Sequence, residues 1–272
     1  MQGRLLPKFE GRFQAHPLGY WEQEFPIAAG LGMDCIEFIF DYQDFEKNPL
    51  WNANGVSEIK QISKATGVEV LTICADFFME CPLHSKCPNE SDFSTKTLIR
   101  LLEQSNALGV TDVIIPCVDQ SSINHFGKLE LLENKIRELI PIASKLGVRL
   151  CLETDLPPCL FANFLRSIDS SSVSINYDTG NSAALGYDFN EEWAEYGFAI
   201  TDLHIKDRLL GGGSIALGEG DVDFCGFFQA LGKFEYKGPI IIQAYRDDEG
   251  VSIFLKQFEF LNKLLSKHYS RT

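Results

Sequence analysis

The stretch "SNALGVTDVIIPCVD", residues 105–119, contains the pattern that decides the fold. A helical segment ends at Gly109, and an apolar run rich in β-branched residues follows at once. Glycine is favoured just past a helix C-terminus because it enters the left-handed backbone region without steric cost. The run that follows has the length and composition of a buried strand. The stretch therefore predicts a helix that leads directly into a strand.

The same pattern recurs along the chain. A glycine precedes a short apolar run at Gly32, Gly67 and Gly147, and looser versions occur in "EYGFAITDLHIKD" and "EYKGPIIIQAY". Each interval between these glycines is long enough for one strand and one helix. Regular alternation of strands and helices is typical of a parallel sheet with crossover helices.

The apolar runs predict eight strands and, from them, the fold class. The predicted strands span about 2–6, 35–40, 69–76, 112–119, 149–156, 173–179, 200–207 and 239–245. Eight such units in a chain of 272 residues match a single (β/α)₈ TIM barrel, with one domain over 1–272. A doubly wound open sheet is the alternative, but no G-x-G-x-x-G turn follows the first strand.

Composition narrows the class of protein. With 45% apolar and 23% charged residues, the chain has the makeup of an ordinary globular protein, and the "MQGRLLPKFEGR" start shows no apolar segment of signal-peptide length. No apolar run is long enough to span a bilayer. The formal net charge of −14 disfavours nucleic acid as a partner. We therefore expect a cytoplasmic protein that binds neither membranes nor nucleic acid.

The eight cysteines favour the same compartment. Several lie in predicted apolar strands, where buried, reduced thiols are expected. Cys81, His84 and Cys87 form a C-x-x-H-x-x-C cluster with the spacing of zinc ligands. A fourth ligand is not evident nearby, so the cluster is a weak signal for a metal site.

The carboxyl ends of the predicted strands carry the polar residues that matter for function, because TIM-barrel sites form there. The acids, the histidine and other polar side chains at these ends are Glu37, Asp41, Asp76, Asp119, Glu153, Asp155, Asp178, Asn181, His204, Lys206, Asp207, Arg208, Gln243 and Arg246. Any single acid could merely cap a helix, as Asp119 and Asp178 could. Carboxylates gathered on successive strands repel each other, and a divalent cation relieves that repulsion. Together they favour a metal site.

Four motifs extend this interpretation to a family. "CLETD", "INYDTGN", "LHIKDR" and "LGEGDVDF" resemble the xylose isomerase-like TIM barrels, in the branch of sugar phosphate isomerases and epimerases. The resemblance covers nearly the whole chain, and H-x-K-D followed by G-E-G-x-x-D-F is its most specific part. It implies a sugar or sugar phosphate as substrate, and it leaves open a homo-oligomer.

The resemblance also implies roles for individual residues. One divalent cation, Mn²⁺, Mg²⁺, Co²⁺ or Zn²⁺, would be held by Glu153, Asp178, His204 and Gln243. Glu153 would be the main acid and base, moving a proton through an enediolate. Substrate would be contacted by Glu37, Asp76, Asn181, Lys206, Arg208 and Arg246. A loop of three glycines, 211–213, with the two arginines, could cradle a phosphate.

Gln243 departs from the family pattern, which usually has glutamate there. An amide oxygen can ligate a hard cation, but an amide cannot act as a general base. Inverting a carbon normally needs one base on each face of the sugar. The amide at 243 therefore favours an isomerase, dehydratase or lyase that uses one base over an epimerase. The alternative is that Glu37, Asp76 or His84 acts as the base on the second face.

Two functions outside this chemistry are also compatible with parts of the pattern. Loss of one acid would permit a non-catalytic member that binds a sugar. Endonuclease IV-like repair enzymes share the fold family, but they need several metal-binding histidines. Of the five histidines here, only His204 lies at a predicted strand end.

Overall fold

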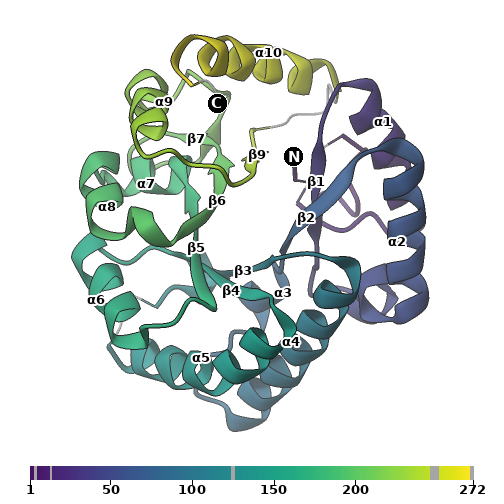
Figure 1. The fold of residues 1–272 in the computed structure, drawn as a ribbon, viewed down its shortest axis with the longest axis vertical. Coiled ribbons are helices and arrows are strands. Elements are labelled where there is room, and N and C mark those ends of the chain that lie inside the picture. Colours follow the sequence, from purple (N-terminus) through teal and green to yellow (C-terminus); the bar gives the residue numbers. More distant parts are fainter. Residues whose placement is uncertain (3–4, 13, 124–125, 246–250, 270–272) are drawn as a thin grey trace.

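The computed structural model describes residues 1–2, 5–12, 14–123, 126–245 and 251–269. Seven parallel strands form one sheet in the order β1-β2-β3-β4-β5-β6-β9, and Figure 1 shows them in the centre of a ring of helices. The strands are β1 (Cys35–Ile39), β2 (Glu69–Cys74), β3 (Asp112–Cys117), β4 (Arg149–Thr154), β5 (Val173–Asp178), β6 (Ile200–Ile205) and β9 (Ile240–Ile242). The predicted (β/α)₈ barrel is confirmed as the fold class.

The N-terminus fills the gap between β9 and β1. The Gln2 backbone N–H donates to the Ile242 carbonyl at 3.2 Å, and the Glu37 N–H donates to the Met1 carbonyl at 2.7 Å. Of the predicted first strand at 2–6, residues 3–4 lie outside the described residues; Gln2 forms a parallel bridge with Glu37, and residues 5–6 are not in a strand. The Leu5 backbone N–H donates to the Glu24 carboxylate at 3.0 Å, so at this residue the chain bonds to helix α1 (Glu24–Gly30) instead of the sheet.

The helices that surround the strands follow the predicted alternation. Gly67 and Gly109 adopt φ of 74° and 94° at the ends of α2 and α4, as the repeated glycine pattern requires. The helices are α1 (Glu24–Gly30), α2 (Ala53–Thr66), α3 (Phe77–Glu80), α4 (Pro88–Leu108), α5 (Phe126–Leu146), α6 (Pro158–Ile168), α7 (Thr179–Leu185), α8 (Phe189–Tyr196), α9 (Phe224–Lys233) and α10 (Val251–His268). None of those in the described residues combines the length and apolarity that crossing a membrane requires.

Extra elements cover the carboxyl ends of the strands. The short helices α3 and α7 begin directly after β2 and β5. A small antiparallel pair, β7 (Asp207–Arg208) and β8 (Ser214–Ile215), follows β6. The Asp207 carboxylate accepts hydrogen bonds from the backbone N–H groups of Gly218 and Gly220 at 2.8 and 2.9 Å. These contacts fold the "LGEGDVDF" loop back onto the end of β6.

One buried carboxylate ties the amino ends of four neighbouring strands together. Asp112, at the start of β3, accepts hydrogen bonds from Arg149 Nε at 2.7 Å, Ser174 Oγ at 3.0 Å and Thr201 Oγ1 at 2.7 Å. Burial by itself raises the pKa of Asp112, but Arg149 and the hydroxyl donors outweigh burial and lower it. The network joins β3, β4, β5 and β6 at their amino ends, opposite the carboxyl ends that carry the predicted site.

We expect Asp112→Ala to destabilise the protein by about 3 kcal/mol, because it leaves the half-exposed Arg149 guanidinium and two hydroxyls without their acceptor. Urea unfolding monitored by circular dichroism measures this. The control is Asp92→Ala, whose carboxylate is exposed and 3.8 Å from Lys135; it should change stability by under about 0.5 kcal/mol. Equal effects of the two substitutions would contradict the assignment.

Candidate active site

Four predicted site residues meet at the carboxyl ends of neighbouring strands. Glu153 lies near the end of β4, Asp178 ends β5, His204 lies in β6 and Gln243 follows β9 directly. All four are buried, with exposed fractions between 0% and 6%. Asp178 and His204 are direct partners in the sheet register. Parallel pairing thus brings together residues that lie far apart in the sequence.

Glu153, Asp178 and His204 have the geometry of a metal-ligand set. One atom from each lies within 4.8 Å of the other two. His204 Nδ1 is 3.6 Å from Glu153 Oε2. Two carboxylates and an imidazole nitrogen at this spacing suit a divalent cation such as Mn²⁺, Mg²⁺ or Zn²⁺. The residues present therefore fit the group that the sequence motifs imply.

Glu37 orients the imidazole of His204 from behind. His204 Nε2 is 2.8 Å from Glu37 Oε1, and Thr72 Oγ1 donates to the other Glu37 oxygen at 2.7 Å. This contact fixes Nε2 as the donor and turns Nδ1 toward Glu153 and Asp178. Burial lowers the pKa of His204, but Glu37, Glu153 and Asp202 outweigh it and raise the pKa to about 10. Nδ1 also lies 3.0 Å from Asn176 Nδ2, an amide group that can only donate, so a cation at Nδ1 would displace that contact.

Asp202 lies beneath this contact and completes a second acid group with Glu37 and His204. It is fully buried, and its Oδ2 lies 4.0 Å from His204 Nε2. Burial, reinforced by the charge of Glu37, raises the pKa of Asp202 well above its ordinary value.

Gln243 presents its amide oxygen to the site. Its Oε1 accepts a hydrogen bond from Lys206 Nζ at 2.9 Å, while its Nε2 donates to Gln2 Oε1 at 2.7 Å. Lys206 Nζ also lies 3.5 Å from Asp178 Oδ2. Gln2 thus sets which end of the amide faces inward. Sequence reasoning missed Gln2, because its partner is 241 positions away and no local pattern marks it.

Glu153 has the environment of a general acid and base. Burial and the neighbouring Asp178 raise its pKa to about 7, although His204, Lys206 and the Asn176 amide act in the opposite direction. Asn176 Nδ2 and Asn181 Nδ2 donate to its two oxygens at 2.8 and 2.6 Å. A carboxyl group with a pKa near 7 exchanges protons readily at neutral pH. Asn176 was also missed, since only the fold turns it inward.

Arg208 supports Asn181 and the glycine loop. Its Nη1 donates to Asn181 Oδ1 at 2.8 Å, and its Nε and Nη2 donate to the Gly212 carbonyl at 3.0 and 2.8 Å. Gly180 lets these side chains approach, because a Cβ there would lie 2.9 Å from Lys206 Cγ. The glycine in "YDTGN" is therefore required by packing.

A cavity of about 210 Å³ opens onto Glu153, Asn181, Lys206 and Gln243. Its other wall comes from the N-terminal segment and from the chain after β1 and β2, and includes Arg12, Gln14, Asp41, Cys74 and Asp76. Polar side chains dominate the lining. Asp178 and His204 meet Glu153 behind this lining, and the predicted contact residues Glu37 and Arg208 do not line the cavity either. Arg246 lies outside the described residues.

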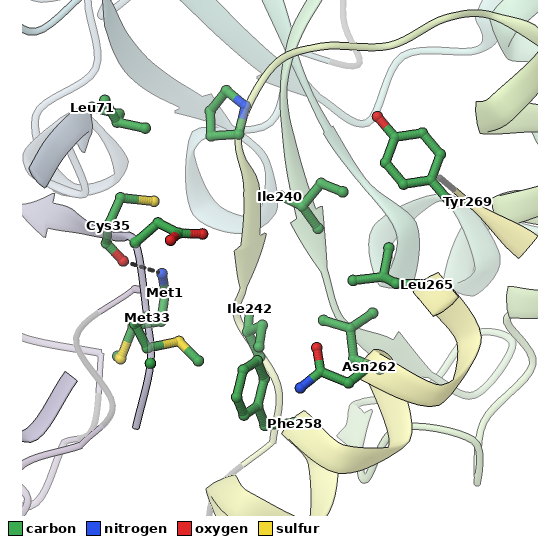
Figure 2. A pocket seen from close by; sticks show the side chains of 14 residues that line it. Met1, Met33, Cys35, Leu71, Ile240, Ile242, Phe258, Asn262, Leu265 and Tyr269 are labelled. Carbon is green, nitrogen blue, oxygen red and sulfur yellow. Dashed lines mark hydrogen bonds between the residues drawn. The ribbon is translucent and has the colours of Figure 1, made fainter. Parts of the chain in front are cut away.

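Two other features lie away from this centre. A cavity of about 360 Å³ sits between the starts of β1 and β9 and helix α10; Figure 2 shows its apolar lining, with Ile240, Phe258 and Leu265. It lacks a convergent set of acids. Among the residues that the structure describes, Cys81, His84 and Cys87 are not brought together as metal ligands.

A parallel barrel with acids and a histidine at the carboxyl ends of its strands defines a TIM-barrel protein with a candidate acid–base and metal site. The chain belongs to the xylose isomerase-like TIM barrel family, whose model matches residues 25–264. A putative L-ribulose-5-phosphate 3-epimerase of Escherichia coli is 22% identical over 243 residues, covering 84% of each chain.

Solved structures share the fold at low sequence identity. The 3-keto-D-glucoside 4-epimerase YcjR of E. coli superposes with a TM-score of 0.72 at 17% identity, covering 89% of this chain and 94% of that chain. The IOLI protein with a bound zinc atom has a TM-score of 0.74 at 16% identity, covering 92% and 93%. These likenesses establish a shared barrel fold.

The raised pKa of Glu153 predicts a pH-dependent stability difference. The folded state holds this proton more tightly than the unfolded chain, so its contribution is fully present below about pH 4.5 and is lost as the pH rises through about 7. Glu153→Gln removes this titration. Relative to wild type, the variant should therefore gain about 2 kcal/mol of stability between pH 5 and pH 8.

Urea unfolding at both pH values, with EDTA present, measures this gain. The control is Glu103→Gln on the exposed face of α4, whose difference from wild type should not change with pH. A Glu153→Gln difference that is the same at pH 5 and pH 8 would contradict the raised pKa.

Proposed function

We propose that the protein is a divalent-metal-dependent sugar or sugar-phosphate isomerase or epimerase with Glu153 as its main acid and base. The observation that carries this is the buried Glu153, whose pKa is raised to about 7 beside the Asp178–His204 ligand pair. The family membership and the epimerase named among the relatives support the same reaction class.

Each polar group of the cavity has a part in this chemistry. A cation held by Glu153, Asp178, His204 and the Gln243 oxygen would polarise a carbonyl and its neighbouring hydroxyl oxygen. Glu153 removes a proton from the carbon beside the carbonyl and returns it later. The Lys206 ammonium, already aimed at the cluster, stabilises the oxygen on which negative charge develops.

The substrate class follows from the same groups. A substrate with a carbonyl next to a hydroxyl would offer two neighbouring oxygens to a cation held by the four ligands. Asn181, which Arg208 holds in place, offers a further contact to a hydroxyl. A phosphate bound at the glycine loop would replace the Gly212 carbonyl as the acceptor of the Arg208 guanidinium. We therefore propose a small ketose or aldose, with or without a phosphate, as substrate.

Gln243 favours a second candidate, a non-catalytic sugar-binding member. Its amide cannot carry a proton, yet its oxygen still faces the ligand set, so binding could persist without turnover. The two candidates share the metal and differ in proton transfer. Exchange of a carbon-bound proton with solvent separates them.

Metal binding tests the ligand set directly. We expect isothermal titration with Mn²⁺ at pH 7.5 to show one site, and Asp178→Asn to weaken it at least tenfold, because one of two anionic ligands is lost. Asp92→Asn, on the exposed face of α4, is the control and should bind like wild type. A wild-type protein that binds no Mn²⁺, or an Asp178→Asn variant that binds equally, would contradict the site.

Proton exchange tests the reaction. In D₂O with Mn²⁺, the wild type should replace the proton beside the carbonyl of D-fructose, D-psicose or L-ribulose 5-phosphate, as followed by ¹H NMR. Glu153→Gln should slow the exchange about 100-fold or more in the sugar whose proton faces Glu153, because the amide cannot accept that proton. Glu103→Gln should exchange at the wild-type rate. Absence of exchange from every sugar, with binding retained, favours the non-catalytic candidate.

A further inference from the structure

We infer that Asp76 is the second proton-transfer residue of this site and serves the substrate face that Gln243 cannot serve. The inference rests on the proposed function and extends it from proton exchange to inversion. It assigns the chain to epimerases, which invert a carbon, although residue 243 is an amide.

The position of Asp76 is that of a group facing the substrate. It follows β2 and precedes α3, yet its side chain makes no capping hydrogen bond to that helix. Instead both oxygens accept from Gln14 Nε2, at 3.3 and 3.0 Å, and Oδ1 lies 3.3 Å from Cys74 Sγ. Asp76 is 8% exposed and lines the same cavity as Glu153 and Gln243. Its surroundings hold the carboxyl group in place and leave it facing the cavity.

The remaining carboxylates on this wall of the cavity are committed elsewhere or lie in solvent. Asp41 pairs with Arg12 at 2.9 Å and accepts the Tyr42 N–H. Glu80 and Asp119 are exposed. Asp41 and Asp76 are the buried acids of this wall, and within the described part of the chain Asp76 differs from Asp41 in having no ion pair.

Glu37 and His84 have no access to the second face of the substrate. Glu37 is fully buried and bonded to His204 and Thr72, outside the cavity lining. His84 is buried in the turn after α3, and it too does not line the cavity. Neither side chain can reach a substrate there without rearrangement of the core.

The electrostatics of Asp76 suit proton transfer. Burial raises its pKa to about 6, with Asp41 and Glu37 adding to the effect and the hydrogen bonds from Gln14 and Cys74 opposing it. Both protonation states are therefore accessible near neutral pH. The chain thus places two carboxyl groups in one cavity, Asp76 on the wall formed after β2 and Glu153 near the end of β4.

The proton balance of the inversion is simple. A sugar held at the Glu153–Asp178–His204 cluster turns its far side to the wall that carries Asp76. Glu153 takes the proton from the carbon, which leaves an enediolate, and protonated Asp76 delivers a proton to the same carbon from the other face. One C–H bond breaks and one forms, with no net oxidation. Glu153 and Asp76 then exchange their protons with solvent, and the reverse reaction uses them in opposite order.

The test uses a pair of sugars that differ only at carbon 3, D-fructose and D-psicose, with Mn²⁺ in D₂O. The wild type should interconvert them and place one deuterium at carbon 3. Asp76→Asn should invert at least 100-fold more slowly, yet still exchange the carbon 3 proton of one epimer, the one that Glu153 faces. Glu153→Gln should show the mirrored pattern and exchange only the other epimer. A structural role for Asp76 would not produce this split.

A rescue variant and a control sharpen the test. Gln243→Glu added to Asp76→Asn should restore part of the inversion, because it returns a carboxylate to the cavity. Asp92→Asn should behave like wild type, and circular dichroism confirms that each variant is folded.

Two different results would overturn the inference. The assignment of Asp76 fails if Asp76→Asn inverts carbon 3 at the wild-type rate. It also fails if the wild type exchanges the proton of one epimer only, without inversion. In both cases the proposed function stands, because proton exchange is retained. Should the wild type exchange neither D-fructose, D-psicose nor L-ribulose 5-phosphate, the proposed function fails for these sugars and the inference fails with it.

Discussion

Repulsion between buried carboxylates around His204 is the constraint on which the rest of the site depends. Glu37, Glu153 and Asp202 all approach one imidazole in a region almost without solvent. An unpaired charge in such a place is costly, so each acid must gain a proton, a hydrogen-bond donor or a cation. The Glu37–His204 contact, the raised pKa of Asp202 and the amide donors on Glu153 relieve part of this repulsion. The same unrelieved charge is what makes the cluster attractive to a divalent cation.

Local patterns were sufficient to predict most of the barrel from the sequence. Gly109 marks a helix end because its left-handed backbone is a property of a single residue, and apolar runs mark strands because a parallel sheet is buried on both faces. Placing Asp178 and His204 side by side also needed only the rule that parallel strands end at one edge. These are short-range or topological regularities, and a single sequence carries them.

The parts that escaped prediction depend on contacts between distant segments. The predicted first strand pairs at Gln2, but Leu5 has left the sheet because its N–H binds the Glu24 carboxylate. Asn176 carries no signature that separates an inward amide from a buried structural one. Glu37 was expected to contact substrate, and only the packing shows that His204 stands in front of it. The orientation of a side chain within the barrel is set by the whole sheet and not by its neighbours in the chain.

The amide at position 243 changes the charge of the site as well as its proton chemistry. In the charge count of the site, a divalent cation would balance Glu153 and Asp178, and the Lys206 ammonium would balance the Glu37 carboxylate that contacts His204. A glutamate at 243 would add one negative charge to this set. The amide therefore leaves the pocket less negative than a glutamate would, which favours anionic species such as an enediolate or a phosphorylated sugar. Moving the second acid to the opposite wall would keep proton transfer while the ligand set keeps this charge. A neutral ligand at Gln243 and a proton-transfer acid at Asp76 are therefore compatible with the charge of the site.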